Sequence, residues 1–92
     1  MASSLEAFEK LDMWKNSNTL LNLTVESQPS IRQRGHIFHV DEELDEVGFV
    51  DEVTRDHVGL VLRGANFTIG ERTLEARRPG EGRVLLEECL VS

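Results

Sequence analysis

The feature that most constrains this chain is a change in the spacing of its apolar residues near Thr19. Before that point, apolar residues recur every three positions, at Leu5, Phe8, Leu11 and Trp14. Ser3, followed three residues later by Glu6, forms the capping box that often starts a helix. The pattern predicts one short helix over residues 3–15, which must pack on other elements because a helix of this length is marginal alone.

From Thr19 onward the apolar spacing changes to two, which is typical of half-buried strands. Turn-forming residues divide this part of the chain into short strands, predicted over 21–26, 31–40, 47–53, 58–63, 65–69, 73–77 and 83–91. Pro79 and Gly80 separate the last two strands, which predicts a hairpin. One helix followed by regularly spaced short strands predicts a mainly β fold, a small barrel or sandwich, in a single domain over residues 1–92.

The apolar face of each predicted element supplies the expected core. The core is predicted to contain Leu5, Phe8, Leu11, Trp14, Leu21, Leu23, Val25, Ile37, Val40, Phe49, Val58, Leu60, Leu62, Phe67 and Leu86. Gly35 interrupts the second strand, where a missing side chain suits a bulge or a sharp bend.

The formal net charge of −7 comes entirely from residues 41–56, which we call the acidic segment. It carries one base, Arg55, against eight acids: Asp41, Glu42, Glu43, Asp45, Glu46, Asp51, Glu52 and Asp56. Phosphate backbones attract clustered Lys and Arg, so this distribution argues against binding of duplex DNA. The acidic segment is predicted to be solvated surface, and the alternative is a docking surface for a basic partner or a divalent ion.

No arrangement typical of an enzyme is present, because the sequence lacks a nucleophile elbow and a phosphate-binding glycine loop. His36 and His39 stand three apart on a predicted strand, which places them on opposite faces, and His57 stands alone. The acids of 41–52 imitate a calcium loop, but Glu46 replaces the glycine that such a loop needs for its turn. We therefore predict no catalytic residues, no metal site and no cofactor.

The single cysteine, Cys89, excludes an internal disulfide. No apolar run approaches the roughly 20 residues of a membrane span, and residues 1–10 lack the pattern of a signal peptide. We expect a cytoplasmic protein that does not contact membranes.

Two segments of the chain are similar to known sequence motifs and follow each other in the same order as those motifs. In the first, Gly35 bends a strand, apolar residues alternate, and Asp41 leads into the loop Glu42-Glu43-Leu44-Asp45. In the second, an apolar strand over 60–62 ends in Arg63-Gly64. Together with the preceding helix, these segments resemble the Sm-like (LSm) family of small β-barrels over residues 3–70.

The resemblance implies a strongly bent five-stranded Sm-like (SH3-like) barrel over residues 19–70, followed by an extra C-terminal hairpin over 71–92. It also implies that the fourth strand, 58–63, pairs with the fifth strand, 65–69, of a neighbouring protomer. Such pairing removes the two unpaired edges of an open barrel, and repeated around an axis it closes a ring. We therefore expect a ring-type homo-oligomer.

Family members bind single-stranded RNA at an inner rim, and the resemblance places that rim at Asp41, Glu43, Asp45, Arg63 and Gly64. The arginine is retained. The base-stacking position holds Glu43, which has no π face, and the position of a hydrogen-bonding asparagine holds Asp45, which cannot donate when ionised. A ring would multiply these carboxylates around one pore, and they would repel phosphates.

Three hypotheses follow, in this order. The first is a non-enzymatic Sm-like ring that binds something other than RNA or serves as a scaffold. The second is an atypical ring that binds single-stranded RNA. The third is an unrelated small β-barrel that docks a basic protein through the acidic segment.

Overall fold

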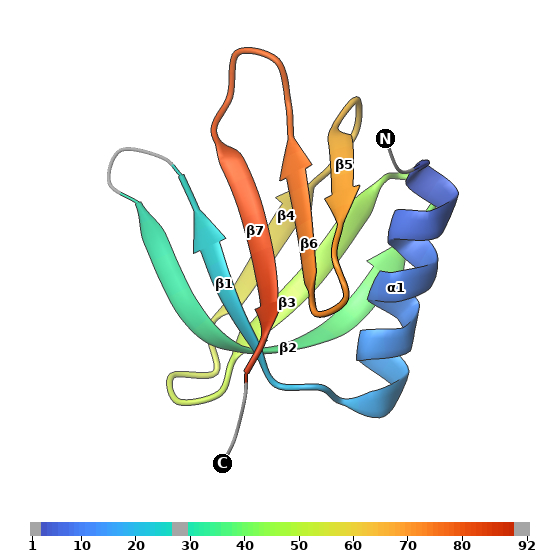
Figure 1. Ribbon diagram of the computed structural model, residues 1–92. Coiled ribbons are helices and arrows are strands. Elements are labelled where there is room, and N and C mark those ends of the chain that lie inside the picture. The colour runs from blue at the N-terminus through green and yellow to red at the C-terminus, as the bar shows by residue number, and fades with distance from the viewer. Residues whose placement is uncertain (1–2, 27–29, 90–92) are drawn as a thin grey trace.

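The computed structural model describes residues 3–26 and 30–89, which form one helix followed by seven strands (Figure 1). The helix, α1, spans Ser4–Ser17. The strands are β1 Leu21–Val25, β2 Ile31–Asp41, β3 Glu46–Asp51, β4 His57–Val61, β5 Asn66–Ile69, β6 Thr73–Arg77 and β7 Arg83–Glu88. The predicted mainly β class with a single N-terminal helix is therefore confirmed. The last two residues of the strand predicted over 83–91 lie outside the described residues.

Helix α1 begins and ends at residues that satisfy its unpaired backbone groups. The Ser3 Oγ accepts a hydrogen bond from the Glu6 N–H at 3.2 Å, as expected for a helix N-cap. At the other end Asn18 adopts a left-handed conformation with φ 53°, and its N–H donates to the Lys15 carbonyl. The helix runs two residues beyond its predicted end.

Leu5 was predicted to lie in the core, and this prediction is wrong, since the residue is 61% exposed. The helix instead buries Ala7, Phe8, Leu11 and Trp14. A helix turns every 3.6 residues, so a spacing of three drifts around its surface and places Leu5 on the side opposite Trp14. The buried stripe follows the helical period rather than the spacing of three.

The seven strands form one antiparallel sheet in the order β4-β3-β2-β1-β7-β6-β5, which is not closed on itself. The C-terminal hairpin is an internal part of this sheet, because β7 pairs with β1 and β6 pairs with β5. Its turn has the hydrogen bond of a β-turn, from the Glu81 N–H to the Arg78 carbonyl at 3.1 Å. Strands β4 and β5 are therefore the two edges of the sheet.

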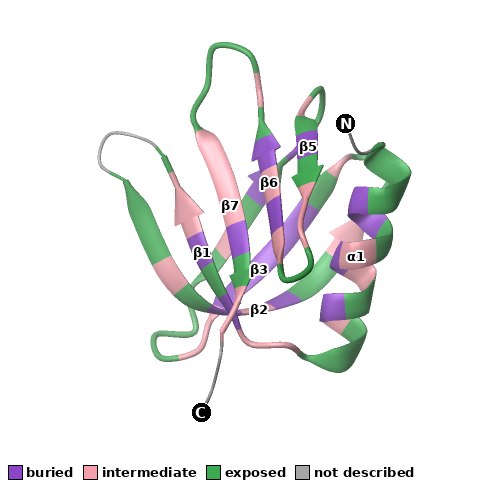
Figure 2. Ribbon diagram, viewed as in Figure 1, coloured by how far each residue is buried: buried purple, intermediate pink, exposed green. Residues whose placement is uncertain are grey.

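The sheet curves around a core that α1 covers beside β2 and β5 (Figures 1 and 2). Most of the predicted core is buried, whereas Val25, Val40 and Val58 are only partly buried and pack against it. Among the described residues, the sequence prediction missed five buried hydrophobic side chains: Ala7, Val47, Val50, Leu74 and Ala76.

The long strand β2 contains two irregularities, a close contact with β3 at Gly35 and a β-bulge at Phe38. A Cβ at Gly35 would lie 1.8 Å from the Val50 carbonyl oxygen, so the close approach of β3 requires glycine there. The pairing register then shifts between Ile37 and His39, which leaves Phe38 as an extra residue in a β-bulge.

The bulge corrects the prediction that His36 and His39 lie on opposite faces. His36 pairs with Val50 and His39 pairs with Gly48, and these two β3 residues are two apart. Opposed residues share a face, so both histidines lie on the face turned away from the core. His57 joins them there because it is the β4 partner of Val50.

Candidate functional site

The predicted rim begins in the turn that joins β2 to β3. The Asp41 carboxylate accepts hydrogen bonds from the Glu43 N–H at 3.0 Å and the Leu44 N–H at 3.1 Å. An aspartate that binds backbone amides two and three residues ahead holds a tight turn. Asp41 therefore shapes this turn, and Glu43 extends from it as an exposed side chain.

The turn after β4 brings the second half of the predicted rim beside the first. Asp45 has a left-handed φ of 51°, and its carbonyl accepts a hydrogen bond from the Leu62 N–H at 2.7 Å. The Arg63 Nε lies 4.0 Å from the Asp45 carboxylate, and Gly64 follows with a φ of 75°. The structure thus brings Asp45 and Arg63 together.

The ion pair between Asp45 and Arg63 is weakly held. The Arg63 side chain is 67% exposed, and an exposed pair of this kind contributes about 0–1 kcal/mol to stability. What the rim offers chemically is a set of carboxylate acceptors around one arginine. Such a surface favours a donor-rich or cationic ligand over a phosphate.

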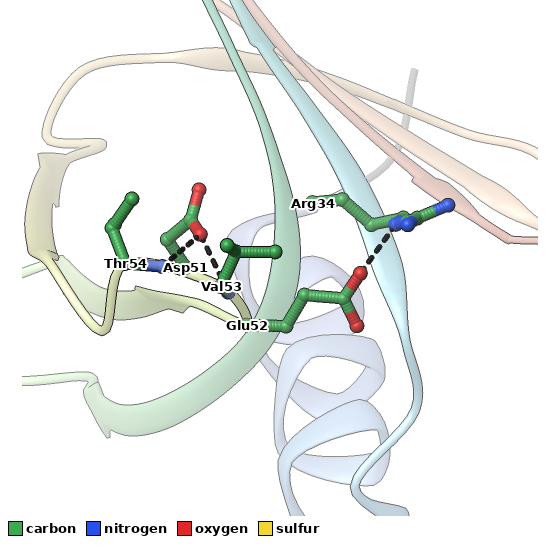
Figure 3. A network of polar contacts seen from close by, with 5 residues as sticks. All are labelled: Arg34, Asp51, Glu52, Val53 and Thr54. Atoms are coloured by element: carbon green, nitrogen blue, oxygen red, sulfur yellow. Dashed lines mark hydrogen bonds and ion pairs between the residues drawn. The ribbon is translucent and has the colours of Figure 1, made fainter.

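A second acidic turn joins β3 to β4 (Figure 3). The Asp51 carboxylate accepts from the Val53 N–H at 2.8 Å and the Thr54 N–H at 2.9 Å. The hydrogen bond from the Thr54 backbone, followed by that from Val53, lowers the pKa of Asp51 below its ordinary value. Beside it the Arg34 Nε lies 2.6 Å from the Glu52 carboxylate.

A polar groove of about 780 Å³ lies beside this turn, on the outer surface of β1, β2 and β7. Its charged lining is balanced: Arg32, Arg34 and Arg83 with Asp51, Glu52 and Glu87. A hydrogen bond to Glu75, together with the charge of Glu26, raises the pKa of Arg83 above its ordinary value. Because two of the three arginines are engaged by carboxylates, the groove has no clear preference for a charged ligand.

The two edge strands present backbone groups to the outside of the sheet. The Leu62 N–H points toward the β3 side, so the antiparallel alternation turns the groups of His57, Gly59 and Val61 outward. The Arg78 guanidinium donates to one of these groups, the Val61 carbonyl, at 3.4 Å.

On the other edge, the Gly70 N–H donates to the Thr73 carbonyl at 3.0 Å, toward β6. The same alternation turns the backbone groups of Phe67 and Ile69 in β5 away from β6. Both edges thus turn backbone groups of alternate residues outward, and on β4 one of these groups, the Val61 carbonyl, is engaged by Arg78.

Three further features of the described residues bear on chemistry. Within residues 3–26 and 30–89, no group of three or more His, Cys, Asp or Glu side chains is arranged to hold a metal ion. Cys89 is a partly exposed free thiol. The part of the chain that the structure describes contains no helix with the length and apolar character needed to cross a membrane.

Comparisons of the chain with family models, with curated proteins and with solved structures gave no match. The resemblance to Sm-like proteins therefore stays a prediction from the two sequence motifs.

Proposed function

We propose that this chain is a non-enzymatic assembly module in which β4 of one copy pairs with β5 of the next, so that identical copies form a ring. The observation that carries the proposal is the strand order, which leaves β4 and β5 as the two edges of the sheet. These are the strands that the Sm-like resemblance assigns to contacts between protomers. On this proposal residues 19–70 form the Sm-like barrel strands, and the β6–β7 hairpin is inserted between β5 and β1.

The chemistry of the edges supports pairing between copies. Unpaired edge groups are a template for an added strand unless charges, prolines or bulges protect them. Strand β4 itself contains no Lys, Arg, Asp, Glu or Pro: its sequence is His57-Val-Gly-Leu-Val61, and Val61 is 46% exposed. The Arg78 guanidinium engages one outward group of β4, the Val61 carbonyl, and an added strand would have to displace it there. Two different edges that fit each other give a head-to-tail contact, and such contacts close into rings when the rotation allows.

Charge favours the β4–β5 contact over a contact between two copies of β4. The acidic segment adjoins β4 and carries −7, so two β4 edges would bring two such segments together. Residues 64–77, around β5, carry two arginines and two glutamates, which gives 2 − 2 = 0. A neutral β5 edge avoids the repulsion between two acidic β4 edges, so charge favours the alternating arrangement.

The rim supports the scaffold over the RNA-binding alternative. Glu43 and Asp45 stand where a stacking ring and an amide would be needed, and Asp45 faces Arg63. The arginine that would close over a base is therefore next to a carboxylate.

Substitutions at Gly59 test the β4 edge without disturbing the pairing of β4 with β3. The Gly59 N–H points outward, so Gly59→Pro removes an edge donor while sparing the β3 ladder, and the matched control Gly59→Ala keeps that donor. Sedimentation analysis should show dissociation of Gly59→Pro and an intact assembly for Gly59→Ala. Val61→Lys, which places a charge on the exposed edge, should also dissociate the assembly and gives a second reading if the proline variant does not fold.

Two results would contradict this proposal. The first is an assembly that survives both Gly59→Pro and Val61→Lys, because the contact would then not use β4. The second is a broad distribution of masses, because a head-to-tail contact that does not close forms filaments instead of a ring.

A further inference from the structure

We propose that the outer face of β3 and β4 carries a groove that receives an arginine or lysine side chain from a basic protein segment. The groove has a volume of about 370 Å³ and is lined by residues of β2, β3 and β4, among them Phe38, Glu46, His57 and Val61. It lies on the face of the sheet, whereas the proposed assembly uses the outward backbone groups of the β4 edge. Both proposals involve Gly59 and Val61, so binding and mass are measured on the same samples to separate them.

Two glycines make the floor of this groove. Gly48 of β3 pairs with His39 on one side and with Gly59 of β4 on the other, so the three residues form one row on the outer face. A Cβ at Gly48 would lie 2.7 Å from the Phe38 ring, whereas a Cβ at Gly59 would meet nothing within 4 Å. The Phe38 ring therefore covers Gly48, and the surface over Gly59 is open as far as the free edge of β4.

An aromatic wall stands on one side of the glycine floor. The Phe38 ring lies 4.7 Å from the His57 ring, with an angle of 33° between their planes. Alternation from the inward Ile37 turns Phe38 outward, and the β-bulge then places His39 on the same outer face, opposite Gly48. Phe38 remains 47% exposed, which leaves ring surface available for contact.

The opposite side of the floor is formed by the next row of the sheet, in which Glu46 pairs with Val61. Val61 supplies apolar surface and Glu46 supplies a carboxylate. A narrow apolar channel between an aromatic ring and a carboxylate fits an unbranched side chain with a cationic end. The methylenes of lysine or arginine would lie over Gly59, and the cation would reach the Phe38 ring or Glu46.

The negative charge around the groove also favours a basic partner. Glu46 belongs to the acidic segment, whose net charge of −7 attracts cations to this end of the sheet. A second copy of the chain would bring the same negative charge, and nucleic acid would bring phosphates. A basic extended segment of another protein is the occupant that both the apolar channel and the charge favour.

The test measures binding of a fluorescein-labelled peptide of alternating arginine and threonine by fluorescence anisotropy, with a glutamate–threonine peptide as the charge control. Gly59→Val adds side-chain atoms to the channel at a position where the added Cβ meets nothing within 4 Å. We expect the arginine peptide to bind, and Gly59→Val and Phe38→Ala each to weaken it by about tenfold or more. Thr24→Val, on the outward side of β1, is the matched control and should bind as the unmodified chain does.

Circular dichroism establishes that each variant is folded. If Phe38→Ala does not fold, Gly59→Val alone decides the test. Equal affinity of Gly59→Val and the unmodified chain would overturn the proposal, since binding would then reflect general charge attraction. Failure of the unmodified chain to bind the arginine peptide would also overturn it, as would stronger binding of the glutamate peptide or of oligouridine. Masses measured on the same samples show separately whether the assembly is intact.

Discussion

At the scale of single residues, two glycines with different surroundings make opposite predictions. A Cβ at Gly35 would lie 1.8 Å from the Val50 carbonyl oxygen, so Gly35→Ala must push β2 and β3 apart. We expect a loss of about 1–3 kcal/mol in the free energy of unfolding, as for other overpacked sites. Gly59→Ala, where nothing lies within 4 Å, should be nearly neutral in the same urea titration. A Gly35→Ala variant as stable as Gly59→Ala would contradict the close strand contact.

The Asp51 carboxylate gives a prediction about acid stability. Its pKa is lowered by the Thr54 and Val53 amides, so the charged form binds the turn more tightly than the protonated form. The resulting stability is present above 3.8, the ordinary value, and is lost as the pH falls through the lowered folded pKa. Asp51→Ala should lower the thermal midpoint at neutral pH. The difference in thermal midpoint between this variant and the unmodified chain should become smaller in acid. A difference that is the same at neutral and acid pH would contradict this role.

The rim residues give a prediction about RNA. Replacing Glu43 and Asp45 together by histidine and asparagine supplies a stacking ring and an amide, and it removes two negative charges beside Arg63. Oligouridine should bind negligibly to the unmodified chain at physiological salt and measurably to this double variant. Adding Arg63→Ala should remove the gain. Tight binding by the unmodified chain would instead favour the RNA-binding ring.

At the scale of elements, two leucines of α1 test how the helix packs. Leu11 is fully buried and Leu5 is 61% exposed, although both belong to the same spacing of three in the sequence. Leu11→Ala should cost about 2–5 kcal/mol of unfolding free energy, and Leu5→Ala less than about 0.5 kcal/mol. Equal losses in a urea titration would show that the helix presents a different face to the sheet.

Much of this element pattern could be predicted because alternation and turn residues are local signals. The predicted strand over 73–77 has the bounds of β6, and that over 21–26 ends one residue beyond β1. The bulge at Phe38 could not be predicted, because an extra residue leaves the local alternation of apolar residues almost unchanged. Its consequence, three histidines on one face, depends on pairing between strands.

The position of the β6–β7 hairpin within the sheet is a second feature that local sequence patterns do not predict. Its turn was predicted from Pro79 and Gly80, but pairing of β7 with β1 joins residues 59 to 67 positions apart. For the rim, the approach of Arg63 to Asp45 was predicted from the resemblance. The role of Asp41 in holding its own turn was not predicted, because it depends on hydrogen bonds from two backbone amides.

At the scale of the whole molecule, the sheet has two unlike ends. One end carries β4, the acidic segment and the groove over Gly59, and the other carries β5 beside α1. Unlike ends that fit each other give chains or rings of copies rather than simple two-fold dimers. The groove would then face outward from each copy, available to a basic partner while the edges are paired.

The central claim, that copies assemble through their edges, is tested most directly by the mass of the unmodified chain in solution. Light scattering on a gel-filtration column at micromolar concentration should give one defined mass that is a multiple of 10.4 kDa. A mass of 10.4 kDa under these conditions, that of a single chain, would contradict the claim.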